Sequence, residues 1–117
     1  MSGVHELSIA MSIVDMAEEE ATQRHGRVVA VHLRLGQLAG VVKDALLSCY
    51  SMASSGTLLE GSELRVEEVP VEIFCGTCNA PRVLSSMQWF ACPVCGTPSA
   101  AVVHGKELEV SALEIEE

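Results

Sequence analysis

Two pairs of cysteines constrain the fold of this chain more than any other feature of its sequence. The motifs Cys-Gly-Thr-Cys at 75–78 and Cys-Pro-Val-Cys-Gly at 92–96 are separated by 13 residues. In a CxxC motif both thiolates can turn towards one ion, and the glycines let the backbone approach it closely. Four such thiolates form a closed tetrahedral site, which is typical of structural zinc. We therefore predict that one structural Zn²⁺ is bound by Cys75, Cys78, Cys92 and Cys95.

The segment that carries these motifs differs in character from the rest of the chain. Residues 71–100 show no helical periodicity and have too little apolar mass to form a core of their own. We predict that they form a zinc-ribbon module that is unfolded without metal. The second motif would also suit a rubredoxin-type iron site, because tetrahedral sulfur coordination does not separate zinc from iron. The short interval between the motifs favours a zinc ribbon.

The remaining residues show the periodicities of two helices and three strands. Apolar residues recur at three- and four-residue spacing over 6–24 and 43–54, which predicts helices. Alternation over 27–38, 63–69 and 106–115 predicts strands, with a β-bulge near Ala112 where the pattern changes phase. In the first strand, the residues expected to face the helices are Val29, Val31, Leu33 and Leu35.

These elements predict an α+β fold: a three-stranded sheet with two helices on one face, plus an inserted zinc-ribbon module. Residues 1–70 and 101–117 would form the α/β domain. Residues 71–100 would form the inserted domain. The fifth cysteine, Cys49, lies on the apolar face of the second helix and is interpreted as a small buried hydrophobic residue.

Charge and composition exclude several classes of protein. The net charge of −9 argues against binding nucleic acid through its phosphates, and an aromatic content of 3% leaves no stacking surface for single strands. No apolar run approaches the roughly 18–20 residues that span a bilayer, and the N-terminus lacks the features of a secretory signal. We therefore expect a cytoplasmic protein with no nucleic-acid or membrane partner.

The N-terminal region offers a candidate site but no catalytic arrangement. Ser8, Ser12, His5 and Asp15 fall on one predicted helix, whose spacing does not assemble a catalytic triad, so we expect that the protein is not an enzyme. From spacing alone, His5 and Glu6 are an exposed polar helix start, with Glu6 favourable at the positive end of the helix dipole.

Several motifs, in order along nearly the whole chain, resemble the HypA/HybF family of hydrogenase nickel-incorporation proteins. They are His-Glu-Leu-Ser-Ile-Ala at 5–10, the strand at 29–36, the segments at 60–64 and 67–70, both CxxC motifs, and Gly-Lys-Glu-Leu at 105–108. The resemblance implies a metallochaperone that binds Ni²⁺ as cargo through His5, aided by Glu6, while the four cysteines hold zinc. It also implies delivery to the large subunit of [NiFe] hydrogenase and a HypB-type GTPase partner. Some members serve urease, which adds urease accessory proteins to the expected partners.

One departure from the family pattern concerns the N-terminus. In the family the histidine directly follows the initiator methionine, whereas here four residues precede His5. Val4 stands where the methionine would stand, and we hypothesise a natural GUG start codon at this position. Imidazole and backbone nitrogen suit square-planar Ni²⁺.

Two other functions remain open: a zinc-ribbon interaction module of the transcription or translation machinery, and a rubredoxin-like electron carrier. Nickel binding separates them from a chaperone.

Overall fold

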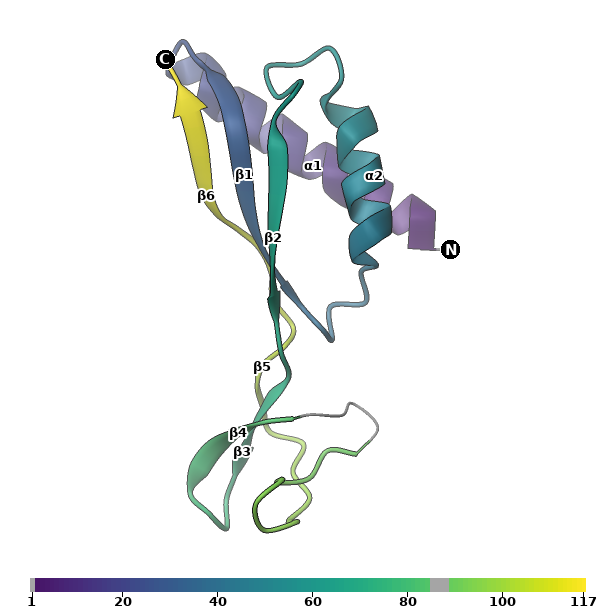
Figure 1. The fold of residues 1–117 in the computed structure, drawn as a ribbon, viewed down its shortest axis with the longest axis vertical. Coiled ribbons are helices and arrows are strands. Elements are labelled where there is room, and N and C mark those ends of the chain that lie inside the picture. Colours follow the sequence, from purple (N-terminus) through teal and green to yellow (C-terminus); the bar gives the residue numbers. More distant parts are fainter. Residues whose placement is uncertain (1, 85–88) are drawn as a thin grey trace. The chain divides into compact units, whose positions relative to one another are not determined.

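Two helices cover one face of a three-stranded sheet in the computed structural model, which describes residues 2–84 and 89–117 (Figure 1). The strands lie in the order β2-β1-β6, so the last strand of the chain joins the sheet formed by the first two, as predicted. This arrangement confirms the α+β fold. The elements are α1 (Ser2–Gln23), β1 (Arg27–Gly36), α2 (Lys43–Ser54), β2 (Glu63–Val69) and β6 (Leu108–Glu116).

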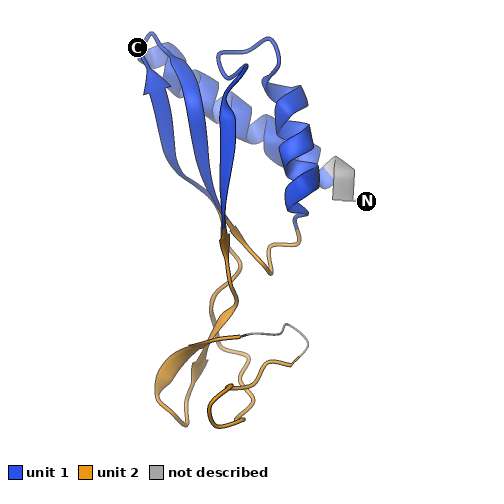
Figure 2. Cartoon of the chain, viewed as in Figure 1, with its two compact units in different colours: residues 1–34, 41–67, 109–117 blue, residues 35–40, 68–108 orange. Residues whose placement is uncertain are grey.

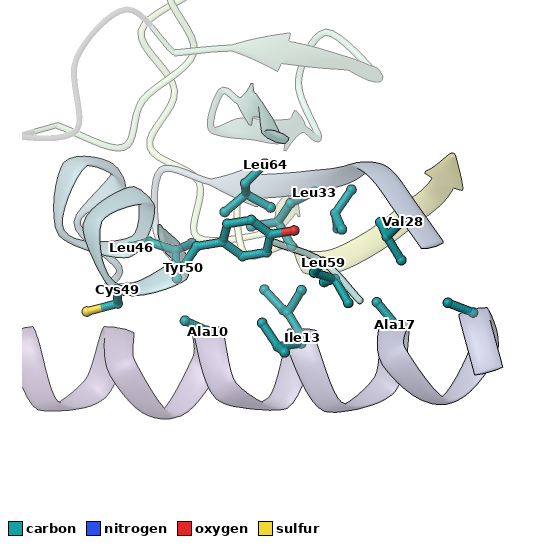
Figure 3. Packing of buried hydrophobic residues seen from close by; sticks show 13 residues of the cluster. Ala10, Ile13, Ala17, Val28, Leu33, Leu46, Cys49, Tyr50, Leu59 and Leu64 are labelled. Atoms are coloured by element: carbon teal, nitrogen blue, oxygen red, sulfur yellow. The ribbon is translucent and has the colours of Figure 1, made fainter. Parts of the chain in front are cut away.

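The core lies between the helices and the sheet. Three alanines of α1, at positions 10, 17 and 21, are fully buried, and their small side chains let this helix approach its neighbours closely. Figure 3 shows two of them facing the side chains of α2 and the strands. Cys49 lies in this core, as its place on the apolar helix face predicts. The buried cluster consists of Ala10, Ile13, Val14, Ala17, Ala21, Val28, Val31, Leu33, Leu46, Cys49, Tyr50, Leu59 and Leu64.

The start of β1 departs from the predicted alternation. Val29 was expected to face the helices, but it is 42% exposed, whereas Val28 and Val31 both belong to the core. An interval of three residues between core positions does not fit a regular strand, in which side chains alternate. The N–H group of Val28 donates to the carbonyl of Leu58 at 3.0 Å. The loop before β2 therefore fixes the start of β1, which a pattern within the strand could not indicate.

The last strand changes phase where the sequence predicts it. Val110 and Leu113 both pack against the core, an interval of three residues, while Ala112 between them is exposed. Ile115 then continues the new phase. The change keeps apolar residues on the helix side at both ends of β6.

The chain divides into two compact units (Figure 2). Residues 1–34, 41–67 and 109–117 form the first unit, and residues 35–40 and 68–108 form the second. The second unit contains a sheet in the order β4-β3-β5, built from β3 (Glu72–Cys75), β4 (Ala80–Val83) and β5 (Val102–His104). It is larger than the segment 71–100 expected from sequence, because residues 35–40 pack with it. Residues 85–88 of that segment lie outside the described residues.

Residues 35–40 join the second unit through backbone hydrogen bonds. Gly36 N–H donates to the carbonyl of Glu107 at 2.7 Å, and Leu38 N–H donates to that of Gly105 at 2.6 Å. Gln37 N–H donates to the carbonyl of Val69 at 3.1 Å. A Cβ atom on Gly36 would lie 2.2 Å from the backbone carbon of Gly105, so only glycine fits this approach. Within the described residues, neither helix is long and apolar enough to cross a membrane.

Candidate metal centre

The hairpin β3–β4 positions the first cysteine pair. Cys75 ends β3 opposite Ala80, and the tight turn between them places Asn79 at a φ of 53°, a conformation that asparagine tolerates. The N–H group of Cys78 donates to Cys75 Sγ at 3.3 Å. The turn therefore brings both sulfurs of the first motif to one side.

A second tight turn positions the other pair. Gly96 N–H donates to the carbonyl of Cys92 at 2.8 Å, and Cys92 N–H donates to the carbonyl of Thr97 at 2.9 Å. Gly96 has a φ of 79°, which glycine adopts without the steric cost of a side chain. This explains the glycine that directly follows the second CxxC motif.

The four sulfurs fit one tetrahedral ion. Their Sγ atoms all lie within 4.8 Å of one another. Sulfurs held about 2.3 Å from a central zinc ion form a tetrahedron with edges of about 3.8 Å. The distances of 3.5 Å between Cys75 and Cys95 and of 3.9 Å between Cys78 and Cys92 lie close to that edge. All four are free thiols, so none is consumed by a disulfide.

The surroundings of Cys92 and Cys95 favour the deprotonated form that binds metal, whereas those of Cys78 do not. Arg82 lowers the pKa of Cys78, but hydrogen bonds with the other cysteines and burial outweigh it and raise the pKa to about 11. Hydrogen bonds with the side chain and the backbone of Thr97 lower the pKa of Cys95. Burial raises the pKa of Cys92, but hydrogen bonds from the backbone N–H groups of Cys95 and Val94 outweigh it and bring the pKa to about 6. Backbone donors at this turn thus prepare two of the sulfurs for a cation.

The four positions differ in access to solvent. Cys75 and Cys92 are buried, Cys78 is half-buried, and Cys95 is exposed. The Thr97 hydroxyl lies 3.1 Å from Cys95 Sγ. The centre is therefore closed on one side, and its exposed ligand position is Cys95.

His5 and Glu6 lie on the first turns of α1, in the first unit, and differ in burial. His5 is exposed, whereas Glu6 is fully buried, so the expected exposed start is wrong for the glutamate. Glu6 Oε2 accepts a hydrogen bond of 2.9 Å from the N–H group of Val42, the residue that precedes α2. The positive end of the α2 dipole favours a carboxylate there. Glu6 Oε1 is also buried and has no hydrogen-bond partner among the described residues.

Sequence reasoning missed three residues at these sites. Val42 contributes only a backbone group, so no side-chain pattern could reveal it. Thr97 lies beside Cys95, and Arg82 lies beside Cys78 and Cys92. Their only signal in the sequence is closeness to the CxxC motifs, since Thr97 follows Cys95 by two residues and Arg82 follows Cys78 by four.

An α+β body with a four-thiolate unit inserted between two of its sheet strands defines a small metal-binding protein. Residues 4–115 match the protein family described as hydrogenase/urease nickel incorporation, metallochaperone, hypA. The chain therefore belongs to the HypA family.

Individual relatives agree with this assignment. A protein named hydrogenase maturation factor HypA from Roseiflexus sp. is 50% identical over 115 residues, which cover 97% of this chain and 94% of the relative. A protein of the same name from Chloroflexus aurantiacus is 51% identical over 112 residues, which cover 95% of this chain and 98% of the relative. Two solution structures share the fold. A HypA protein has a TM-score of 0.71 at 19% identity and 97% coverage of both chains. The Ni metallochaperone HypA from Helicobacter pylori has a TM-score of 0.61 at 20% identity, covering 94% of this chain and 96% of its own.

Proposed function

We propose that this chain is a cytoplasmic nickel metallochaperone that binds Ni²⁺ in its N-terminal region and delivers it to the large subunit of [NiFe] hydrogenase. The observation that carries the proposal is the presence of two donor sets of different kinds in separate units. One is an exposed imidazole, and the other is a closed group of four sulfurs. The softer, closed set suits zinc, and the exposed nitrogen set suits a cation that must be released.

His5 is the proposed nickel ligand, and Glu6 is the proposed residue that supports it. An exposed histidine near a chain end can exchange its metal with a partner. Because Glu6 Oε2 is bonded to Val42, the first turns of α1 are tied to the start of α2. This bond would hold the backbone next to His5 in one position. Glu6 Oε1 retains free lone pairs for a donor group at the site.

The four cysteines are the proposed ligands of structural zinc. Bound zinc would cross-link the two tight turns of the second unit, whose own buried apolar cluster is small. Transfer of nickel would not require this ion to change ligands, since a four-thiolate site leaves no open coordination position.

The proposed partners are a HypB-type GTPase, the hydrogenase large subunit and urease accessory proteins. The net charge of −9 would steer the chain towards partners with basic patches and away from nucleic acid. Delivery of a cation between proteins requires no catalytic group on this chain, which agrees with a binding role rather than an enzymatic one.

Nickel titration of the zinc-loaded protein tests the proposal. We expect one Ni²⁺ per chain with micromolar or tighter affinity, lost in His5→Ala while zinc content is unchanged. His25→Asn is the matched control, because His25 is also exposed and its φ of 54° is one that asparagine accepts. A chain shortened to begin with Met in place of Val4 tests the contribution of a neighbouring α-amine. The proposal would be overturned if neither the shortened chain nor the 117-residue chain bound nickel.

The metal content separates the other two functions. A colourless protein with one zinc per chain excludes a rubredoxin-like iron carrier, whose sulfur-bound iron is red. Zinc binding without nickel binding would instead favour the zinc-ribbon interaction module.

A further inference from the structure

Strand β4 places Arg82 on the side of the hairpin that carries the metal centre. In the β3–β4 pairing, Cys75 lies opposite Ala80 and Ile73 lies opposite Arg82. Residues two positions apart on a strand share a face, and directly paired residues do too. Arg82 therefore projects from the same face of the hairpin as Cys75.

The guanidinium of Arg82 lies beside the sulfurs of the metal centre. Hydrogen bonding with Cys78 and Cys92, one from each CxxC motif, raises the pKa of Arg82. Its Nε is buried and has no hydrogen-bond partner within the described part of the chain. A buried cationic group requires a compensating negative charge, and the thiolates of this centre are the groups placed to provide it.

We propose that Arg82 is a positioning residue of the metal centre, donating N–H···S hydrogen bonds to Cys78 and Cys92 and offsetting the negative charge of the zinc-bound thiolates. The inference rests on the proposed zinc site. Four thiolates carry two more negative charges than Zn²⁺ neutralises, and one guanidinium removes half of that excess. A planar guanidinium can also donate to two acceptors at once, which the compact ammonium of lysine does less well.

The proposal makes the four ligands unequal. Electron density donated to N–H groups is less available for attack on an electrophile, so Cys78 and Cys92 should be the protected sulfurs. Cys95 is also hydrogen bonded, with the Thr97 hydroxyl, but it is the exposed sulfur, so a reagent reaches it first. We expect Cys95 to be the ligand that detaches first and reacts first.

Two measurements on the zinc-loaded full chain test this role. In the first, a chelator competes for zinc with the parent chain, Arg82→Met and Arg82→Lys. Loss of a group that orients metal ligands typically weakens binding 10–100-fold. We expect a loss of about that size in Arg82→Met and partial recovery in Arg82→Lys. Arg24→Met is the matched control, because Arg24 is an exposed arginine directly after α1, paired with Glu20 in the other unit.

In the second measurement, the zinc-loaded proteins react with iodoacetamide and the modified cysteines are identified by peptide mass spectrometry. Each reacting thiolate displaces iodide, forming a C–S bond in place of the C–I bond. We expect Cys95 to be modified first in the parent chain, and half-buried Cys78 to react at a comparable rate in Arg82→Met. A purely structural role for Arg82 would expose all four cysteines together instead.

The outcomes separate this inference from the proposed function. If the parent chain binds no zinc, the proposed zinc site fails and the inference fails with it. If zinc binds but Arg82→Met keeps the parental affinity and order of modification, only the inference is overturned. First modification of Cys78 in the parent chain would also overturn it. If Arg82→Met does not fold, as judged by circular dichroism, Arg82→Gln replaces it in both measurements.

Discussion

Glu6 Oε2 accepts a hydrogen bond of 2.9 Å from the backbone N–H of Val42, although 36 residues separate the two in the sequence. The glutamate side chain is fully buried, and the bond itself is partly buried. It connects the start of α1, which carries the exposed His5, to the start of α2. A cation bound at His5, as proposed, would therefore be linked to the packing of the two helices through one carboxylate.

We expect Glu6→Ala to destabilise the first unit. The substitution leaves the N–H of Val42, which lies in a partly buried hydrogen bond, without its acceptor, and this costs about 1–3 kcal/mol. Glu6→Gln should cost less, since its amide oxygen can still accept the bond while the favourable charge near the α2 dipole is lost. Urea unfolding of both variants provides the measurement, with Glu19→Ala, an exposed carboxylate of α1, as control. Equal stability of Glu6→Ala and Glu19→Ala would contradict the prediction.

A methyl group on Gly36 should disrupt the contact between residues 35–40 and residue 105. Its Cβ would lie 2.2 Å from the carbonyl carbon and oxygen of Gly105 and 2.7 Å from the backbone nitrogen of Glu107. Backbone atoms cannot rotate out of the way, so we expect Gly36→Ala to cost at least the 1–3 kcal/mol typical of overpacking.

Gly40→Ala is the matched control for that substitution. Gly40 has open space around its Cβ position but a φ of 75°, so alanine there costs only about 1–2 kcal/mol of backbone strain. Thermal unfolding should show the larger loss in Gly36→Ala, together with loss of the protected amides of Gly36 and Leu38. Equal losses in the two variants would contradict the prediction.

Local periodicity predicted the two helices, the three strands β1, β2 and β6 and the change of phase in β6, because each depends on side chains close in sequence; the short strands β3, β4 and β5 were not predicted. The spacing of the cysteines likewise predicted that four sulfurs would meet. The exposure of Val29 and the burial of Glu6 were not predictable in this way. Each goes with a hydrogen bond to a backbone group distant in sequence: Val28 N–H donates to the carbonyl of Leu58, and Glu6 accepts from Val42 N–H. The contact of Arg82 with two sulfurs depends on strand register, which a single sequence does not reveal.

The pair His104–Glu107 gives the second unit a pH dependence at low pH. Hydrogen bonds from His104 Nδ1 (2.7 Å) and the N–H of Gly105 (2.7 Å) lower the pKa of Glu107 to about 2. A lowered carboxyl pKa stabilises the folded state above its ordinary value, and that contribution is lost as the pH falls from about 4.5 towards 2.

A carboxyl-detected NMR titration measures this pKa directly. We expect the Glu107 resonance to titrate near pH 2. His104→Gln should raise this midpoint, because the side chain at position 104 then carries no positive charge beside the Glu107 carboxylate. The exposed carboxyl of Glu19 on α1 serves as the reference in the same spectrum. A Glu107 midpoint close to that of the reference in the parent chain would contradict the prediction.

Removal of the metal should unfold the second unit while leaving the first one intact. Among the described residues, the buried apolar cluster of the second unit consists of Val71, Ile73 and Leu84, with three partly buried residues packed against them. So small a cluster cannot offset the conformational entropy of ordering residues 68–108. The first unit has its own core between two helices and a sheet, and that core contains none of the four CxxC cysteines. Hydrogen exchange before and after chelation measures both units in one experiment. We expect the amides of β3 and β4 to lose protection, and those of α1 and β1 to keep it; unchanged protection in β3 and β4 would contradict a structural role for the metal.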